Sequence, residues 1–370
     1  MNSIGVYVHI PFCDGKCPYC DFYSLPTPTP LLMDDYTEAL IRAAADWSAR
    51  TGVIADTVYF GGGTPSLLGA HRLSRVLSSV RAAFGVQDDA EITMEVNPSR
   101  DLSEVLQAFY AAGGNRLSIG MQSVHNEELR LLGRRHTRQD VERTVSCARR
   151  IGLDNISLDV MLGIPKSTME SVVQSVDAAA TMGARHVSAY MLKIEPDTPY
   201  GRCTPSLPDD DTTADMYLAT MDRLDSHGFT QYEISNAAID GYESRHNLKY
   251  WLSDPYIGIG PAASSYWNGR RFTYSRDISA FMRGEKPIAD AATAIGVGSE
   301  QEYACLRLRL RDGIDEVEFS RRFRHTIPAI WRERASTLPR ELVVSDQRGI
   351  RLTRQGFLVS NLLIGHIFDE

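Results

Sequence analysis

Apolar and polar residues follow two alternating patterns from the start of the chain to about residue 227. Short runs rich in β-branched and aromatic residues predict strands, and longer segments with apolar residues every three to four positions predict helices. The predicted strands cover residues 4–10, 57–60, 91–96, 116–121, 155–162 and 186–192. The predicted helices cover residues 34–50, 70–84, 102–112, 127–132, 138–151, 168–182 and 209–227, with Asp34 or Asp35 as the first N-cap. This alternation predicts an α/β fold with a parallel sheet, either open or curled towards a barrel.

The second half of the chain has a less regular pattern. Residues 230–238 read as a last strand, and residues 245–261 read as irregular and rich in aromatic side chains. From residue 300 onward, helices and a polar hairpin predict a small winged-helix-like module. Its predicted elements are helices at 300–308, from 314, at 327–336 and at 353–367, with the hairpin at 342–352. We therefore expect an α/β domain over 1–240, a linker region over 241–299 and the module over 300–370.

The ends of the predicted strands carry unusual turns. They are the loop 13–20 and the segments 61–65, 97–98, 122–123, 163–165 and 195–196. In parallel α/β folds the functional residues gather at the carboxyl ends of the strands. All of these turns fall on that one rim, which predicts an active or binding site there.

Three cysteines lie close together in the first of these loops. Cys13, Cys17 and Cys20 have the spacing C-x3-C-x2-C. Thiolates are the ligands that iron–sulfur clusters select, and three of them leave one iron of a [4Fe–4S] cluster without a protein ligand. A zinc site with His9 as a further ligand, or cysteines with no ligand, are the alternatives. The other cysteines, at positions 147, 203 and 305, stand alone and are expected to be small buried hydrophobic residues.

Further polar and glycine-rich positions follow the strands. The segment 61–65 reads GGGTP, and its glycines either let the backbone cradle a ligand or merely make a tight turn. Glu95 and Asp159 interrupt apolar strands, where an unpaired carboxylate is costly. Together with Gln122 and Arg134 they are candidates for ligand contact, and a structural ion pair is the alternative for each.

A second unusual patch occupies residues 246–251, with the sequence HNLKYW. An imidazole, an amide and two aromatic rings suit a flat, partly apolar ligand, or a metal porphyrin that needs an axial ligand. The alternative is a core-packing loop in which His246 caps a helix.

Composition narrows the choice of class and compartment. The chain has 370 residues and a formal net charge of −8, which argues against a general nucleic-acid binder. No apolar run has the length of a membrane span, and the first residues lack the pattern of a signal peptide. We expect a cytoplasmic protein, and in that compartment clustered cysteines are better read as metal ligands than as disulfides.

Together these motifs resemble the radical S-adenosylmethionine (SAM) superfamily. The resemblance extends over nearly the whole chain to its oxygen-independent coproporphyrinogen III oxidase-like branch, through Tyr7 to Cys13, the glycine turn, residues 95–98 and residues 159–165. It implies a partial (βα)6 barrel whose cysteine loop holds a [4Fe–4S] cluster. It also implies that SAM chelates the open iron and that one electron from the cluster cleaves its sulfonium.

The resemblance assigns roles residue by residue. It places four residues against the cluster-bound SAM: Tyr7, Tyr19, Gly62 and Glu95. Five others match positions that border an additional SAM in the true oxidases: Gly63, Thr64, Gln122, Arg134 and Asp159. Whether this chain binds a second SAM stays open.

Two departures separate the chain from the true oxidases. Phe22 stands where they have a further cysteine, and they carry a long arm before the first strand. By contrast, His246, Asn247, Tyr250 and Trp251 match the HNxxYW signature of the haem chaperone subgroup, whose members bind haem and deliver it to haem-dependent respiratory proteins.

The resemblance thus implies a haem chaperone with a [4Fe–4S] cluster, SAM and haem, in which His246 or a neighbour contacts the haem. Such a chaperone is expected to lack coproporphyrinogen III oxidase activity and to approach a membrane only through its acceptor. The alternatives are that oxidase, a radical enzyme that modifies haem, and a structural protein stapled by the cluster. The oligomeric state stays open, with a dimer as one alternative.

Overall fold

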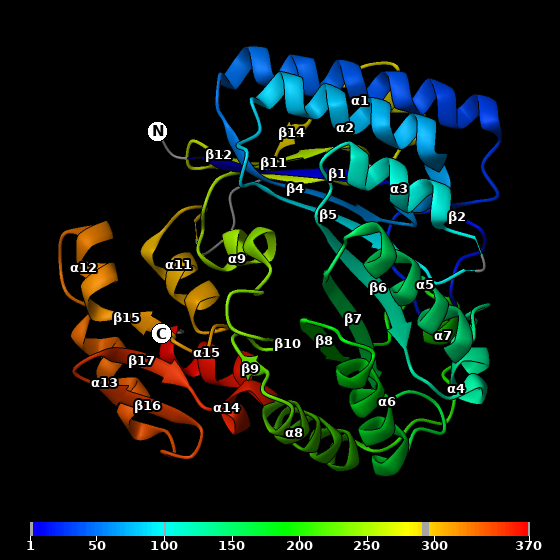
Figure 1. The fold of residues 1–370 in the computed structure, drawn as a ribbon. Coiled ribbons are helices and arrows are strands. Elements are labelled where there is room, and N and C mark those ends of the chain that lie inside the picture. Colours follow the sequence, from blue (N-terminus) through cyan, green and yellow to red (C-terminus); the bar gives the residue numbers. More distant parts are fainter. Residues whose placement is uncertain (1–2, 100, 291–295, 369–370) are drawn as a thin grey trace.

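The structure, a computed structural model, describes residues 3–99, 101–290 and 296–368. Six parallel strands form the centre of a strongly curved sheet, with the order β1-β4-β5-β6-β7-β8 (Figure 1). They are β1 (Ile4–Ile10), β4 (Ala55–Gly62), β5 (Glu91–Val96), β6 (Arg116–Gln122), β7 (Asn155–Leu162) and β8 (His186–Met191). The predicted α/β fold with a partial (βα)6 barrel is confirmed.

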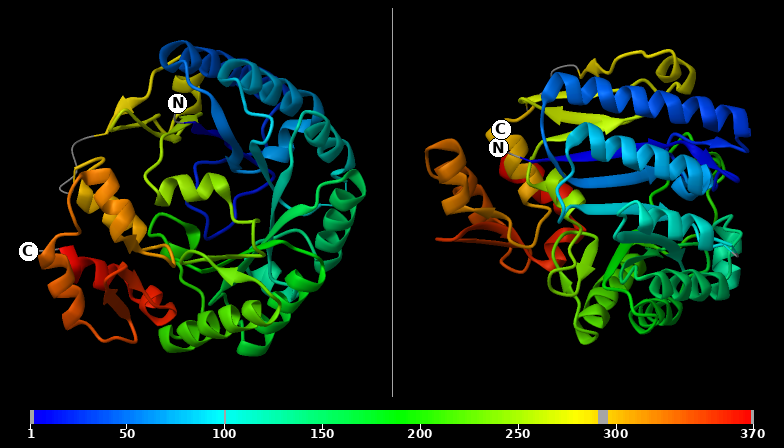
Figure 2. Two further views of the ribbon diagram at one scale, coloured as in Figure 1. Left: turned by 60° about the vertical axis from the view of Figure 1, so that its left-hand side comes forward. Right: turned by 45° about the horizontal axis from the view of Figure 1, so that its top comes forward.

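Helices cover the outer face of this sheet, as the end-on view in Figure 2 (left) shows. They are α1 (Pro30–Thr51), α2 (Gly69–Phe84), α3 (Ser103–Ala111), α5 (Arg138–Ile151), α6 (Met169–Thr181) and α8 (Asp210–Ser226). Two short helices, α4 (Asn126–Leu131) and α7 (Pro199–Arg202), contact each other, and α7 also contacts the cysteine loop. Apolar side chains from the helices and from the outward face of the strands form one continuous core. The core therefore lies between sheet and helices, and the inside of the barrel is left for other side chains.

The first helix begins earlier than its sequence pattern suggests. Thr29 is the N-cap of α1 and its hydroxyl accepts a hydrogen bond from the backbone N–H of Leu32, while Pro30 occupies the first helical position. The predicted cap at Asp34 or Asp35 was wrong. A proline preorganised for the first turn, preceded by a threonine cap, outweighs the later acidic residues.

The sheet continues beyond the six central strands on both sides. On the β8 side it adds the hairpin of β10 (Asn236–Ala238) and β9 (Thr230–Gln231). On the β1 side it adds β11 (Tyr256–Ile259), β12 (Ser264–Trp267), β13 (Arg270–Thr273) and β14 (Ile288–Ala289), with α10 (Ile278–Met282) between the last two. The segment 241–299 thus contributes four strands to the same sheet, although residues 291–295 lie outside the described part of the chain. The boundaries at 240 and 299 stay predictions.

The interpretation of residues 245–261 as irregular was wrong. They contain α9 (Arg245–Trp251) and β11, which pairs in parallel with β1. The carboxylate of Glu91 accepts hydrogen bonds from the backbone N–H groups of Arg245 and His246, both at 3.0 Å. A helix start that depends on a residue about 150 positions earlier leaves little trace in the local sequence.

The C-terminal segment forms the predicted module of helices and a hairpin, at the left of Figure 1. Its elements are α11 (Glu300–Arg307), β15 (Ile314–Asp315), α12 (Glu316–Phe323), α13 (Ala329–Thr337), β16 (Val343–Asp346), β17 (Gly349–Leu352), α14 (Arg354–Leu358) and α15 (Ser360–Phe368). The three strands pair in the order β15-β17-β16. The single helix expected at 353–367 is two helices, because Val359 leaves the helical conformation between them.

Ion pairs tie this module to the barrel domain. Arg354 contacts Asp222 and Asp225 of α8, at 2.6 Å and 2.7 Å. In the described part of the chain, no helix has both the length and the apolar composition needed to cross a lipid bilayer.

Candidate functional site

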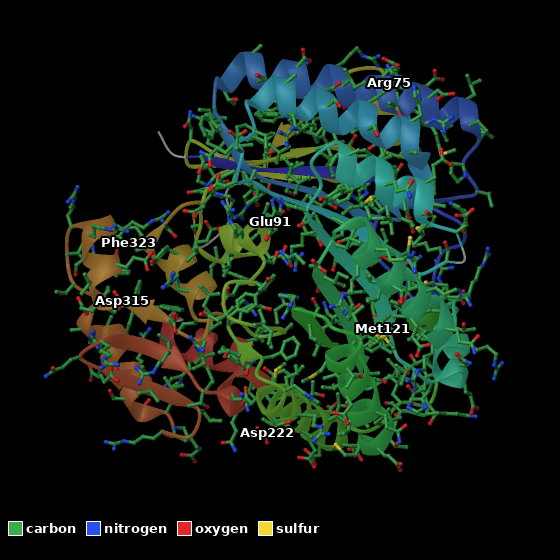
Figure 3. All side chains as sticks on the ribbon, in the orientation of Figure 1. Arg75, Glu91, Met121, Asp222, Asp315 and Phe323 are labelled. Atoms are coloured by element: carbon green, nitrogen blue, oxygen red, sulfur yellow. The ribbon has the colours of Figure 1, made fainter. Side chains whose placement is uncertain are left out.

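Polar side chains line the inside of the barrel. Along β6 the alternate residues Arg116, Ser118, Gly120 and Gln122 all face a cavity of about 610 Å³. Successive side chains of a strand point to opposite faces, so the whole inward row of β6 contacts this space. Figure 3 draws the side chains on these strands and labels Met121, which alternates with the inward row of β6. A cavity lined by polar groups within a parallel barrel is the usual form of a ligand site.

The three clustered cysteines open onto this cavity. Cys13 ends β2 (Phe12–Cys13), which pairs with β3 (Leu25–Pro26), and Cys17 and Cys20 follow on a turn closed by a 3.1 Å backbone hydrogen bond between them. All three are free thiols. Burial raises the pKa of Cys13 and of Cys20. A hydrogen bond from the Thr64 hydroxyl, 3.8 Å from the Cys13 sulfur, opposes part of the rise at Cys13.

The arrangement of these thiols fits a cluster. Among the described residues, no three His, Cys, Asp or Glu side chains converge so as to hold a single metal ion. In a [4Fe–4S] cluster each thiolate binds a separate iron, so the sulfurs need not meet at one point. Of the remaining cysteines, Cys203 is exposed, so the expectation that it is buried was wrong, whereas Cys147 and Cys305 are half-buried.

The glycine turn after β4 brings backbone against the cysteine loop. Gly62 has φ 107°, and a Cβ there would lie 2.4 Å from the ring of His9. The N–H of Gly62 donates to the carboxylate of Glu95 at 3.1 Å, and the N–H of Gly63 donates to the carbonyl of Ile10 at 2.8 Å. Only glycine combines this conformation with this close approach.

Two carboxyl groups inside the barrel carry raised pKa values. Burial raises the pKa of Glu95 to about 7, opposed by a 2.8 Å hydrogen bond from the Tyr59 hydroxyl, while the charge of Asp159 adds to the rise. Burial likewise raises the pKa of Asp159 to about 6, opposed by a hydrogen bond from Ser118. Carboxyl groups that face a cavity with so little compensation fit a ligand that carries positive charge, such as the ammonium and sulfonium groups of SAM.

Arg134 joins the cysteine loop to the strand ends. Its guanidinium donates to the Tyr19 hydroxyl at 2.7 Å and 3.0 Å and to the Asn97 side-chain oxygen at 2.7 Å. The amide of Asn97 donates to the Thr64 hydroxyl at 2.8 Å. At the end of β6, Gln122 is held at φ 66°. A non-glycine residue in this strained conformation is typical of a functional position.

Most of the residues predicted for the site come together at this cavity. Those that line it are Cys13, Cys17, Tyr19, Cys20, Gly62, Gly63, Glu95, Gln122, Arg134 and Asp159. Thr64 lies behind Cys13, and Tyr7 lies beside Tyr59, with their rings 6.2 Å apart. Neither lines the cavity in this conformation.

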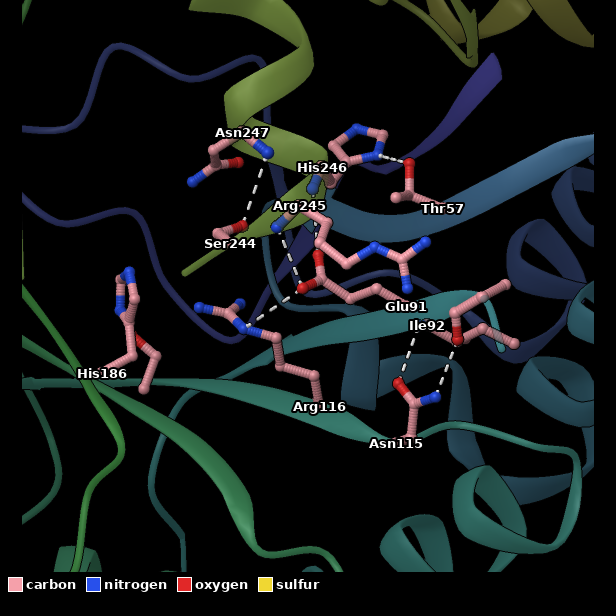
Figure 4. Close-up of polar contacts among 12 residues, drawn as sticks. Thr57, Glu91, Ile92, Asn115, Arg116, His186, Ser244, Arg245, His246 and Asn247 are labelled. Carbon is pink, nitrogen blue, oxygen red and sulfur yellow. Dashed lines mark hydrogen bonds and ion pairs between the residues drawn. The ribbon is translucent and has the colours of Figure 1, made fainter. Parts of the chain in front are cut away.

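His246 lies deeper, on the first turn of α9. It is 1% exposed; its Nδ1 is 2.8 Å from the Thr57 hydroxyl and its Nε2 is 2.9 Å from the Tyr250 hydroxyl. Both nitrogens are therefore hydrogen-bonded in this conformation, and burial lowers the pKa of the ring to about 3. The next residue, Asn247, lines the cavity (Figure 4). The sequence predicts Asn247 only as a member of the HNxxYW motif, with no role of its own.

Among the cavity residues that sequence reasoning missed, three have evident roles. The Tyr59 hydroxyl donates to the Glu95 carboxylate, and the Tyr190 hydroxyl donates to the Gln122 side chain at 2.8 Å. Arg116 faces the lower part of the cavity, which is the part at the amino-terminal ends of the strands. Strand alternation could have found Tyr59 and Arg116, since each stands an even number of positions from Gly63 or Gln122 on or at the end of its own strand. Tyr190 lies on β8, which carries no predicted site residue, so alternation gave no signal for it.

Comparisons with known proteins agree with this geometry. A family model of the radical SAM superfamily matches residues 7–179. The heme chaperone HemW of Escherichia coli K12 is 37% identical over 325 residues, which cover 86% of this chain and 86% of that protein. The heme chaperone HemW of Bacillus subtilis 168 is 32% identical over 381 residues, which cover 99% of both chains. The chain belongs to the HemW family.

The fold of this HemW-family chain also matches a solved enzyme structure. The coproporphyrinogen III oxidase HemN of E. coli superposes with a TM-score of 0.84, over 100% of this chain and 90% of that one, at 21% identity. At this level of identity the match establishes the fold alone. The radical SAM domain implies a [4Fe–4S] cluster and SAM as the cofactors of the HemW-family barrel.

Glu95 gives the cluster-free protein a specific pH dependence. Its carboxyl has an ordinary pKa of 4.5 and a folded-state pKa of about 7, so between these values the unfolded chain is ionised while the folded chain stays protonated. Its contribution to stability is complete below about pH 4.5 and is lost as the pH rises through about 7. Between pH 5 and pH 8 we expect the free energy of unfolding of Glu95→Gln to fall by about 2 to 3 kcal/mol less than that of the wild type.

Urea unfolding of the cluster-free wild type and of Glu95→Gln at pH 5, 6, 7 and 8 measures this difference. The matched control is Glu127→Gln, because Glu127 is an exposed carboxylate paired with Lys166. Parallel stability curves for wild type and Glu95→Gln would contradict the prediction.

Proposed function

We propose that this HemW-family chain is a cytoplasmic haem chaperone that carries a [4Fe–4S] cluster, binds SAM and haem, and delivers haem to haem-dependent respiratory proteins. The observation that carries the proposal is one cavity on which three free thiols, the buried carboxyl groups of Glu95 and Asp159, and the α9 motif residue Asn247 all open. The relatives that match most of this chain's length are named heme chaperones, which supports the proposal.

The upper part of the cavity, at the carboxyl ends of the strands beside the cysteine loop, is proposed to hold the cluster and SAM. Cys13, Cys17 and Cys20 hold the cluster, which when bound supplies the electron that can cleave a sulfonium. Glu95, fixed by Tyr59 and the N–H of Gly62, receives the positive charge of SAM and keeps its own proton only while the site is empty. Tyr7 and Tyr19 are the other residues assigned to contact the cluster-bound SAM.

An additional SAM is proposed to lie beside the first, against the strand ends next to the cysteine loop. The residues assigned to it are Gly63, Thr64, Gln122, Arg134 and Asp159. Arg134 orients this group, because its hydrogen bonds fix both Tyr19 and Asn97. Equilibrium dialysis of the reconstituted protein with labelled SAM gives the stoichiometry directly.

His246 is proposed to contact haem. Since both ring nitrogens are hydrogen-bonded, coordination of iron requires the ring to give up Tyr250 or Thr57. We expect His246→Ala to weaken haem binding at least about tenfold, the usual loss when a good polar contact is removed, and to change the Soret band. Tyr250→Phe removes the partner of Nε2 and is expected to keep or strengthen haem binding.

Anaerobic reconstitution followed by haem titration tests the proposal as a whole. A saturable Soret band, and transfer of the haem to an apo respiratory haem protein, are the expected results. An unchanged titration with His246→Ala would remove that residue from the haem site. Formation of protoporphyrinogen IX from coproporphyrinogen III, or of a modified tetrapyrrole, would replace the chaperone by an enzyme.

A further inference from the structure

Arg116 is a buried cation without a close partner at the amino-terminal end of the barrel. The residue is 1% exposed and lines the cavity. Its Nε has no hydrogen-bond partner among the described residues, and the nearest carboxylate oxygen, from Glu91, is 3.9 Å away. A buried charge that lacks hydrogen bonds is strongly destabilising unless something else compensates it.

Glu91 does not satisfy this guanidinium, because its carboxylate serves α9. The two carboxylate oxygens accept the backbone N–H groups of Arg245 and His246 at 3.0 Å each. Figure 4 shows the guanidinium of Arg116 projecting from β6 toward Glu91 and the start of α9. Asp159 also interacts with Arg116, whose charge opposes the rise that burial causes in the pKa of Asp159, and it accepts a hydrogen bond from Ser118.

Other unpaired polar atoms surround Arg116. Thr93 on β5 and Asn155 on β7 are in register with it on either side, and each has a buried side-chain oxygen without a hydrogen-bond partner in the described structure. Asn236 of β10 lines the cavity and has a buried side-chain oxygen in the same condition. The amide of Asn247 faces the cavity from α9. Unpaired oxygens of this kind mark a polar region that water or a ligand completes.

We propose that Arg116, with Asn247, forms a subsite for the carboxylate of an organic ligand in the lower part of the cavity, at the amino-terminal ends of the strands. A guanidinium whose Nε–H is unpaired matches a carboxylate in shape and charge, and the side-chain amide of Asn247 supplies a further donor. Arg116 and Gln122 stand at opposite ends of β6, about 20 Å apart at ~3.3 Å per residue. The subsite is therefore separate from the end of the barrel that carries the cysteine loop.

Two ligands of the barrel could supply this carboxylate. One is a propionate of haem, and this source rests on the proposed function; the other is the amino-acid carboxylate of a SAM molecule. The place of Arg116, linked through Glu91 to the backbone of His246, favours the propionate.

The test combines a variant that lacks the Arg116 charge with ligand analogues that lack the carboxylate charge. Reconstituted wild type and Arg116→Gln are titrated anaerobically with haem, haem dimethyl ester, SAM and 5′-methylthioadenosine, which lacks the carboxylate. We expect Arg116→Gln to weaken haem binding about tenfold or more, as for a lost charge-assisted hydrogen bond, and to leave the ester unaffected. The same pattern confined to SAM and methylthioadenosine would support the subsite and assign the carboxylate to SAM.

Controls keep the outcomes distinct. Arg245→Gln removes a neighbouring guanidinium that is exposed and donates to the Asp89 carbonyl, and it should change none of the four affinities. If Arg116→Gln does not fold, the same titrations are made with Arg116→Lys. The affinities of the wild type for haem and for its dimethyl ester are then compared directly. Equal effects of Arg116→Gln on each ligand and its carboxylate-free analogue, or no effect at all, would overturn the subsite. Failure of the wild type to bind haem would overturn the proposed function, and the SAM pair would then decide the subsite alone.

Discussion

Replacing Cys17 by alanine is expected to leave the reconstituted protein almost without iron and without the visible absorption of a [4Fe–4S] cluster. The same result is expected for Cys13→Ala and Cys20→Ala, since the cavity-facing loop offers three thiols and a cluster held by two of them has a second iron open. SAM-dependent formation of 5′-deoxyadenosine, which needs the electron from the cluster, should disappear with it.

The matched control is Cys203→Ala, because Cys203 is a free thiol that is exposed and does not line the cavity. Its iron and sulfide content should equal that of the wild type. Iron analysis, the absorption spectrum and product chromatography on the four variants make the comparison. Undiminished iron in Cys17→Ala would contradict the cluster assignment and return the zinc and ligand-free alternatives.

The upper part of the site could be predicted because its residues break local rules. Glu95 and Asp159 interrupt apolar strands, and three cysteines share one short loop. Parallel strands bring their carboxyl ends to one rim, so residues far apart in the chain meet there without any knowledge of their contacts. Much of the predicted rim therefore lines the observed cavity, which also extends to Arg116 at the other end of β6.

The lower part of the site could not be predicted in the same way, because its contacts are long-range. Glu91 looks like an ordinary first residue of a strand, yet it caps α9 through Arg245 and His246. Arg116 likewise begins a strand, where a charged residue is commonplace at a surface, and only the curvature of the partial barrel and the packing of α9 bury it. The same holds for β11, which is short and becomes a strand by pairing with β1.

The motif of His246 illustrates the remaining limit. Its residue types suggested a porphyrin contact, and the alternative was a core residue. The structure places the ring between Thr57 and Tyr250, in contacts that either role allows. The pairing of each nitrogen depends on β4 and α9 meeting, which the sequence of six residues does not specify.

Replacing Gly63 by alanine is expected to destabilise the protein by about 3 kcal/mol, because the new methyl group has no space to enter. A Cβ at Gly63 would lie 2.6 Å from the carbonyl oxygen of Phe12 and 2.8 Å from that of Ile10. These are backbone atoms of the segment that leads to Cys13, so they cannot turn aside as a side chain would. Urea unfolding of the cluster-free protein, with iron content after reconstitution, measures the effect.

Gly241→Ala separates this clash from the loss of a glycine as such. Gly241 has φ 82° and open space around its Cβ position, so its replacement should cost only the strain of a left-handed residue, about 1 kcal/mol. Equal losses in the two variants would contradict the packing argument. A loss at Gly63 already present without cluster or SAM identifies its role as the tight turn, whereas a loss confined to SAM binding identifies it as the ligand cradle. The two interpretations that the sequence left open for residues 61–65 therefore predict different results, and Gly63, packed against backbone on one side and facing the cavity on the other, is the position that can distinguish them.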